Sequence, residues 1–160
     1  MKHIEEQIEF LKTVKRRERA ICTIHEGFAV FGDAYHLTVI EEKLFVFDIE
    51  KLKLINRITS FSPDTIKSMI IEPDTLCLKL TGKELKHNNH MLVEFERSDG
   101  KLVYMQKKFL KNIDLKSATF EQVKTRDGNI NGGIQIFEKH TLLMYCMPHR
   151  VEYYKGANND

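Results

Sequence analysis

The sequence predicts a single α+β domain over residues 1–155, built mainly of antiparallel β-sheet and followed by a frayed tail at 156–160. The clearest helical spacing of apolar residues lies at the N-terminus, whereas apolar and polar residues alternate with a period of two after residue 19. Gly, Pro and Asp turn signals separate these alternating segments, as in sheets made of hairpins and meanders. A chain of 160 residues, of which 42% are hydrophobic, can bury one core without disulfides.

One amphipathic helix is predicted over residues 2–18. Four apolar residues recur there at spacings of four, three and three, which places them on one helical face: Ile4, Ile8, Leu11 and Val14. Acidic residues come first and basic residues last, the order that the helix dipole favours. They are Glu5, Glu6 and Glu9, followed by Lys15, Arg16, Arg17 and Arg19. We expect this helix to pack on the sheet.

Strands are predicted after the helix wherever β-branched and aromatic residues alternate with polar ones. In the first half of the chain they are expected at 20–25, 28–31, 36–40, 43–48 and within 51–61. The Ser62-Pro63-Asp64 triplet is a turn or helix-start signal, since proline suits the first position of a helix. Residues 65–69 are therefore expected to form one helical turn.

The clearest hairpin is predicted between 90–97 and 101–106, because Asp99-Gly100 tolerates the positive φ angles of a tight turn. A strand at 75–80 precedes this hairpin. The polar segment 83–90 is predicted to be an exposed loop. The acidic residues of the hairpin are expected on its solvent face: Glu94, Glu96 and Asp99.

A short helix is expected near 115–124, where Phe120 and Val123 lie three residues apart. The glycine-rich connection after it lacks the regular spacing and the Lys-Ser/Thr pair of a phosphate-binding loop. The last strands are expected at 133–138, 141–146 and 151–154.

Five residues between 101 and 123 carry a resemblance to a known family: Val103, Tyr104, Asp114, Thr119 and Phe120. The stretch is similar to the repeat unit of the bacterial DKNYY-type proteins, in which a strand ending in V-Y-Y leads to a turn containing T-F. The segment 43–67 resembles this stretch weakly, either as a second copy that would make the chain repeat-like or as a recurring strand-turn-helix pattern. The resemblance implies an architecture and no activity.

The composition narrows the classes of function. The net charge of +2 gives no whole-molecule field that would hold nucleic acid or an anionic membrane, so either role needs a local patch. Charges interrupt every apolar run at the N-terminus, and no stretch is long enough to cross a bilayer. The three widely spaced cysteines, Cys22, Cys77 and Cys146, are expected to be buried free thiols in a reducing compartment. These observations predict a cytoplasmic protein without membrane contact.

The strongest local charge is a basic cluster at the end of the N-terminal helix: Lys12, Lys15, Arg16, Arg17 and Arg19. On a helix this basic cluster could bind phosphates. Lys107, Lys108 and Lys111 would extend the cluster if the two segments lie side by side. Basic residues also collect at helix C-termini for dipole reasons alone, and no aromatic residues interleave with these as a base-stacking surface requires.

Histidines supply the other candidates. His87 and His90 could share a metal ion or act as acid and base. Cys146 and His149 have the C-x-x-H spacing of half a zinc site, with His140 or His36 available to complete it. Solvated loop histidines and a buried thiol beside a strand end are the structural alternatives. The set of Asp33, His36 and His25 has no nucleophile motif beside it.

The best-supported expectation is a non-enzymatic module that recognises another protein, of the kind found among small bacterial or phage binding and immunity-type proteins. It rests on a mixed surface charge, many strands and the lack of a constellation that could run a reaction. No cofactor is expected. The alternatives are a nucleic-acid-binding protein using the basic cluster, and a small metal-dependent or histidine-based hydrolase. The oligomeric state stays open, because an exposed strand edge could pair with a second copy of the chain.

Overall fold

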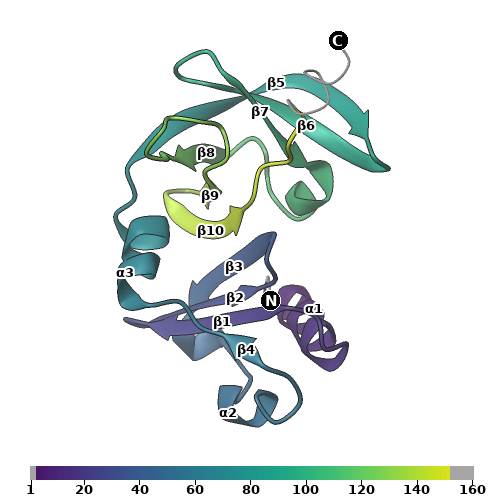
Figure 1. Ribbon diagram of the computed structural model, residues 1–160, viewed down its shortest axis with the longest axis vertical. Coiled ribbons are helices and arrows are strands. Elements are labelled where there is room, and N and C mark those ends of the chain that lie inside the picture. The colour runs from purple at the N-terminus through teal and green to yellow at the C-terminus, as the bar shows by residue number, and fades with distance from the viewer. Residues whose placement is uncertain (1–2, 152–160) are drawn as a thin grey trace.

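The computed structural model describes residues 3–151 (Figure 1). The N-terminal half contains α1 (Ile4–Lys15), β1 (Ala20–His25), β2 (Phe28–Gly32), β3 (His36–Glu41), η1 (Glu42–Leu44), α2 (Ile49–Leu52), β4 (Ile58–Thr59), α3 (Pro63–Ile66) and η2 (Lys67–Ile71). The C-terminal half contains β5 (Thr75–His87), β6 (His90–Arg97), β7 (Leu102–Gln106), η3 (Lys107–Leu110), β8 (Ala118–Val123), β9 (Ile134–Glu138) and β10 (Thr141–Cys146).

The described strands form one ten-stranded sheet in the order β4-β1-β2-β3-β10-β9-β8-β5-β6-β7. Every pairing is antiparallel except that of β1 with β4. The meander β1-β2-β3 joins the C-terminal strands through β10, whose Met144 lies opposite Thr38 of β3. The predicted α+β class with mainly antiparallel sheet is confirmed.

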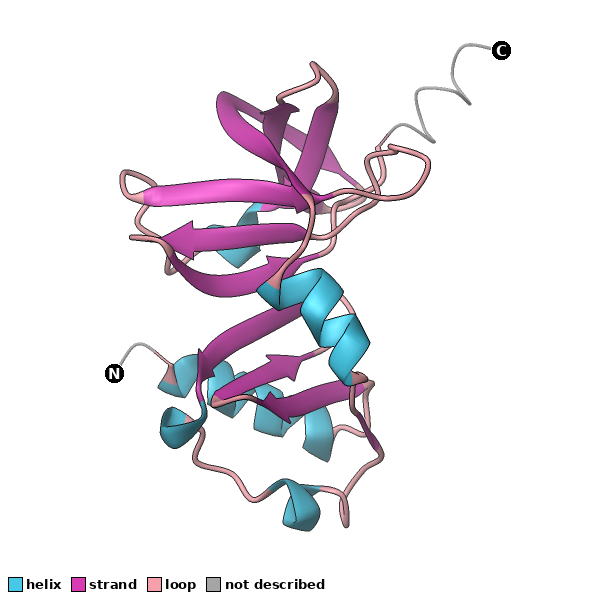
Figure 2. Cartoon of the chain, turned by 90° about the vertical axis from the view of Figure 1, so that its left-hand side faces the viewer, coloured by secondary structure: helices cyan, strands magenta, loops and turns pink. Residues whose placement is uncertain are grey.

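Helices cover both faces of the N-terminal meander (Figure 2). On one face α1 places Phe10 against Phe31, with ring centroids 5.5 Å apart. On the other face the short helix α3 buries Ile66 against Ile21 and Val30. Both faces of these strands are therefore apolar, and burial of that surface is the main source of their stability.

The C-terminal strands curl around a core of their own (Figure 1). Phe95 of β6 and Phe120 of β8 meet there with ring centroids 4.9 Å apart. Met144 and Cys146 of β10 belong to the same core. Strand β10 thus closes one core while pairing with the strand that borders the other, so its end is a junction between the two halves.

The N-terminal helix is shorter than predicted and buries only the second half of the predicted stripe, Leu11 partly and Val14 fully. Gln7, Phe10 and Val14 are buried, whereas Ile4 and Ile8 of the predicted stripe are 44% and 45% exposed. The Gln7 side of the helix faces inward because the Gln7 side chain donates to the Leu44 carbonyl at 2.9 Å and accepts from the Val46 amide at 2.9 Å. These two bonds satisfy the buried amide and turn its face of the helix inward.

Two local predictions in the C-terminal half are wrong. The expected loop 83–90 is a tight hairpin, because Asn88 and Asn89 both adopt positive φ, at 47° and 65°, and join β5 directly to β6. The expected short helix at 115–124 is largely strand β8, which is held between β5 and β9. Strand pairing with these distant segments overrides the weak helical spacing.

Other differences are smaller. Residues 43–48 form no strand, and only Ile58–Thr59 of the 51–61 segment does. Cys22 and Cys146 are buried as expected, whereas Cys77 is exposed. The tail at 156–160 and most of the strand expected at 151–154 lie outside the described residues. None of the helices in residues 3–151 is long and apolar enough to cross a membrane.

Glu94 is not on the solvent face that the alternation predicts. It is buried on β6, where it accepts hydrogen bonds from the Tyr104 hydroxyl at 2.9 Å and from the Thr81 hydroxyl at 2.9 Å. Val151 packs beside it on Leu92 and Tyr104. The second face of the β6–β7 hairpin is therefore covered by the chain that follows β10.

Candidate functional site

The structure brings together the three histidines His87, His90 and His149. His87 and His90 flank the two-residue turn between β5 and β6, so a hairpin necessarily places them side by side. Nδ1 of His87 lies 2.8 Å from Nε2 of His149, and the rings of His90 and His149 have centroids 5.6 Å apart. One nitrogen of the close pair must carry the proton and the other must accept it.

The segment 147–151, here called the C-terminal strap, positions His149. The Met147 amide donates to the Tyr35 carbonyl at 2.9 Å, and the His149 amide donates to the Tyr104 carbonyl at 2.7 Å. The strap therefore runs from the β2–β3 turn to the outer strand β7, with Pro148 between the two bonds. Val151 is buried at its end.

The environment keeps His149 uncharged at neutral pH. Burial lowers the pKa of His149, and the neighbouring His87 and His90 lower it further, because each additional positive charge disfavours its protonated form. The imidazole is therefore a neutral group that can gain a proton when an anion approaches.

A cleft of about 650 Å³ opens beside the strap and is here called the histidine cleft. The β2–β3 turn, β6, the β7–η3 junction and the strap form its walls. Its polar lining consists of Asp33, His90, Gln106, Lys108, His149 and Arg150, and its apolar lining includes Tyr35, Phe109 and Met147. Basic groups outnumber the single carboxylate.

A second depression of about 350 Å³ lies between the β5–β6 hairpin and the segment 107–115, and is here called the lysine-rimmed groove. A bulge opens it: Leu80 pairs with Phe95 and Glu84 pairs with Val93, so three residues of β5 face one residue of β6. Gly82 adopts a φ of 84° within this bulge. The floor is apolar and is made of Leu80, Val93 and Leu110.

The predicted basic cluster is exposed but mixed with acids. Lys15, Arg16, Arg17 and Arg19 are exposed at the end of α1, and Lys12 pairs with Glu9 at 2.8 Å. Lys108 and Lys111 do face α1, across a cleft of about 560 Å³ that Glu5, Glu6 and Glu9 also line. This cleft is here called the helix cleft. Lys12, Arg16 and Lys111 lower the pKa of Glu9, which stays ionised and opposes a polyanion.

The other candidates do not assemble. Asp33 Oδ1 accepts from the amides of Tyr35 and His36 at 2.8 and 2.9 Å and so holds a backbone turn. The His36 ring stacks on Phe109, and burial lowers its pKa. His25 lies at the end of β1 and His140 in the β9–β10 turn. No group of three or more His, Cys, Asp or Glu within residues 3–151 is placed to hold a metal ion.

The buried cysteines Cys22 and Cys146 are protonated at neutral pH. Burial raises the pKa of the Cys22 thiol to about 12 and raises that of Cys146 further. A protonated thiol is a poor nucleophile and a poor metal ligand. Within residues 3–151, no hydroxyl or thiol hydrogen-bonds to the imidazole of His90 or His149.

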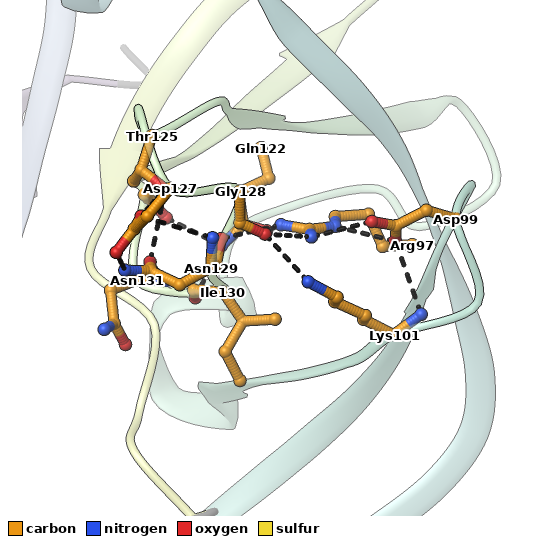
Figure 3. Close-up of polar contacts among 11 residues, drawn as sticks. Arg97, Asp99, Lys101, Gln122, Thr125, Asp127, Gly128, Asn129, Ile130 and Asn131 are labelled. Atoms are coloured by element: carbon orange, nitrogen blue, oxygen red, sulfur yellow. Dashed lines mark hydrogen bonds and ion pairs between the residues drawn. The ribbon is translucent and has the colours of Figure 1, made fainter.

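A third polar cluster surrounds Arg97, which is 2% exposed (Figure 3). Its guanidinium donates to both carboxylate oxygens of Asp99, to Gln122 Oε1 and to the carbonyls of Gly128 and Asn129, at 2.8–2.9 Å. Lys101 Nζ donates to the same Gly128 carbonyl at 2.9 Å. These bonds fix the glycine-rich connection before β9.

That connection contains a spacing that sequence reasoning missed. Asp127, Asn129, Asn131, Gly132 and Glu138 match the D-x-N-x-N-G-x5-E spacing of calcium-binding loops. In the structure Glu138 ends β9 opposite Ala118, at the far end of the strand from this loop. The Asp127 and Asn129 side chains bond within the loop, and the Gly128 and Asn129 carbonyls accept from Arg97 and Lys101.

No family model, no curated protein and no solved structure matches this chain. The resemblance to DKNYY-type proteins therefore stays a prediction. Its two segments adopt different structures, since 101–123 contains β7, η3 and β8 whereas 43–67 contains α2, β4 and α3.

Proposed function

We propose that the protein is a non-enzymatic recognition module that binds an acidic, amphipathic segment of another protein in the lysine-rimmed groove. The observation that carries the proposal is the charge pattern around an apolar floor. Lys83, Lys107 and Lys111 stand at the rim, and the one carboxylate, Glu84, is paired with Lys107 at 2.6 Å. Protein interfaces combine an apolar centre with a charged rim in this way.

The apolar part of the groove offers a docking point for one or two large side chains. Leu115 forms its wall and is 50% exposed, and Leu80 is half-buried. A partner residue such as Leu or Phe would cover them, and flanking carboxylates would meet the lysines. The buried free thiols Cys22 and Cys146 support a cytoplasmic location for this module.

A binding assay with labelled peptides tests the proposal. Fluorescence anisotropy would compare 15-residue peptides that carry a Leu or Phe anchor flanked by Asp and Glu with the same peptides carrying Lys instead. We expect only the acidic set to bind, and Lys111→Glu to weaken that binding by about tenfold or more, whereas the exposed Lys51→Glu changes it less than twofold. Equal loss in both variants, or no binding of any acidic peptide, would refute the proposal.

Nucleic-acid binding remains the competing function because Lys15, Arg16, Arg17 and Arg19 are exposed on one helix end. The same assay includes labelled single-stranded DNA and RNA across a salt series. Binding that weakens steeply with salt and is lost in Arg16→Glu would favour this alternative over protein recognition.

A further inference from the structure

We infer that the histidine cleft binds a small organic phosphate that carries hydroxyl groups. This site is separate from the lysine-rimmed groove and does not rest on the function proposed for it. Its volume of about 650 Å³ lies within the range of small-molecule sites. Six polar or charged side chains line it, whereas the floor of the groove is apolar.

The cations of the cleft are available to an anion. Lys108 and Arg150 line it, both are exposed, and neither forms an ion pair with any residue of the described chain. One oxygen of the only carboxylate, Asp33, is taken up by two backbone amides. A guanidinium presents paired donors that match phosphate oxygens, and an ammonium adds a point charge.

The imidazoles add donors that respond to the ligand. His90 and His149 line the cleft, and His87 stands behind His149, fixing its ring through the 2.8 Å contact. A bound dianion favours the protonated imidazole and thereby offsets the burial that keeps His149 neutral. Binding is therefore coupled to proton uptake, which a mere surface cation patch would not produce.

Gln106 indicates that the ligand brings a hydrogen-bond donor. Its side chain lines the cleft, and its Oε1 is buried without a donor among the described residues. An unsatisfied buried acceptor is costly, so turning the Gln106 amide toward a hydroxyl group of the ligand would relieve that cost. Inorganic phosphate offers this interaction less well than a phosphate ester with neighbouring hydroxyls.

The neighbouring helix cleft limits the length of the anion. The two clefts share Asp33, Lys108 and Phe109, and the stacked rings of His36 and Phe109 stand at that boundary. Beyond it, Glu5, Glu6 and Glu9 line the wall. A nucleic-acid strand passing through would meet these carboxylates, whereas a small phosphate ester ends before them.

Isothermal titration calorimetry with glucose 6-phosphate, ribose 5-phosphate and glycerol 3-phosphate tests the inference, with inorganic phosphate, glucose and citrate as reference compounds. We expect saturable binding of at least one ester, tighter than that of inorganic phosphate and citrate. Arg150→Ala should weaken it by about tenfold or more, whereas the exposed loop variant Arg126→Ala should leave it within about twofold. Titrations in buffers of different ionisation enthalpy should reveal proton uptake at pH 7.

Thermal unfolding of Arg150→Ala serves as the folding control, because this exposed side chain should not affect stability. Lys111→Glu should leave ester binding intact, so failure at the groove and failure at the cleft are distinguishable. The inference is wrong if no ester binds at concentrations up to about 10 mM, if Arg150→Ala and Arg126→Ala behave alike, or if inorganic phosphate or citrate binds as tightly as the esters.

Discussion

The Arg97 network and the histidine cleft are both polar clusters built largely from the C-terminal half, but they differ in how completely their groups are paired. An arginine has five N–H donors, and Arg97 uses all five at distances of 2.8–2.9 Å. Its acceptor Gln122 is also saturated, since its Nε2 donates to the carbonyls of Ile130 and Gly132 at 2.7 and 2.8 Å.

The histidine cleft has the opposite character. Its cations Lys108 and Arg150 are exposed and its acceptor Gln106 Oε1 has no donor within the described chain. A closed and saturated network has nothing left to offer a ligand and acts on stability, whereas an open and unsaturated one gains from a ligand. The difference separates structural from binding residues more reliably than residue type does.

The largest expected effect follows from breaking the closed network. Arg97→Ala leaves Gln122 Oε1 buried without its donor, takes one donor from each of the carbonyls of Gly128 and Asn129, and removes the charge opposite Asp99. We expect a loss of about 2–4 kcal/mol in the free energy of unfolding, measured by urea denaturation.

The matched control is Arg126→Ala, whose exposed side chain lies in the same connection. Its effect should stay within about 0.5 kcal/mol. If the two variants were equally stable, the Arg97 network would not be the element that holds the glycine-rich connection, and the contrast with the cleft would fail.

The sequence predicts those elements of the two clusters whose conformation depends on neighbouring residues. The β6–β7 hairpin follows from Asp99-Gly100 and from alternation, and it is confirmed. The spacing of three residues names His87 and His90 as a pair, but the tight turn that sets them side by side stands where the sequence predicts a loop. The β8 segment lacks such a signal: its conformation is decided by pairing with β5 and β9, which no short window contains.

The remaining site residues come from distant segments. His149 lies 62 residues from its partner His87, and it reaches it only because β10 pairs with β3 and directs the strap toward β7. Lys108 and Gln106 face the same cleft from another element. No spacing in the sequence encodes this convergence, so the histidines could be named as candidates but the cleft could not.

A smaller effect is expected from the pH dependence of stability. The pKa values of His149 and His36 are lowered in the folded protein. The unfolded chain therefore binds protons more readily once the pH falls below the ordinary histidine pKa of about 6.5. Stability is therefore full above that pH and declines as the pH falls through the lower folded values. Asp33 partly opposes the lowering of the His36 pKa, and Lys108 adds to that lowering.

Urea denaturation of wild type and His149→Gln at pH 7.5 and pH 5 measures this effect. The variant should lose part of the acid destabilisation while keeping its stability at pH 7.5, because glutamine can still hydrogen-bond to His87. His36→Gln provides the comparison, since His36 contacts Phe109 and lies outside the histidine cluster. An unchanged pH slope in both variants would mean that burial of these rings does not control their protonation.

The smallest effect is expected at the exposed edge of the Arg97 network. The Arg97 guanidinium, by its hydrogen bonds, holds the pKa of Asp99 at about 2, below the ordinary value of 3.8. This stabilisation is present above about pH 4 and is lost as the pH falls through 2. Because Asp99 is solvent-exposed, Asp99→Asn should shift the urea midpoint at pH 7 far less than Arg97→Ala does. It should also flatten the acid limb of the stability curve between pH 4 and pH 2. A shift as large as that of Arg97→Ala would show that the charge pair, and not the bonds to Gln122 and the loop carbonyls, carries the network.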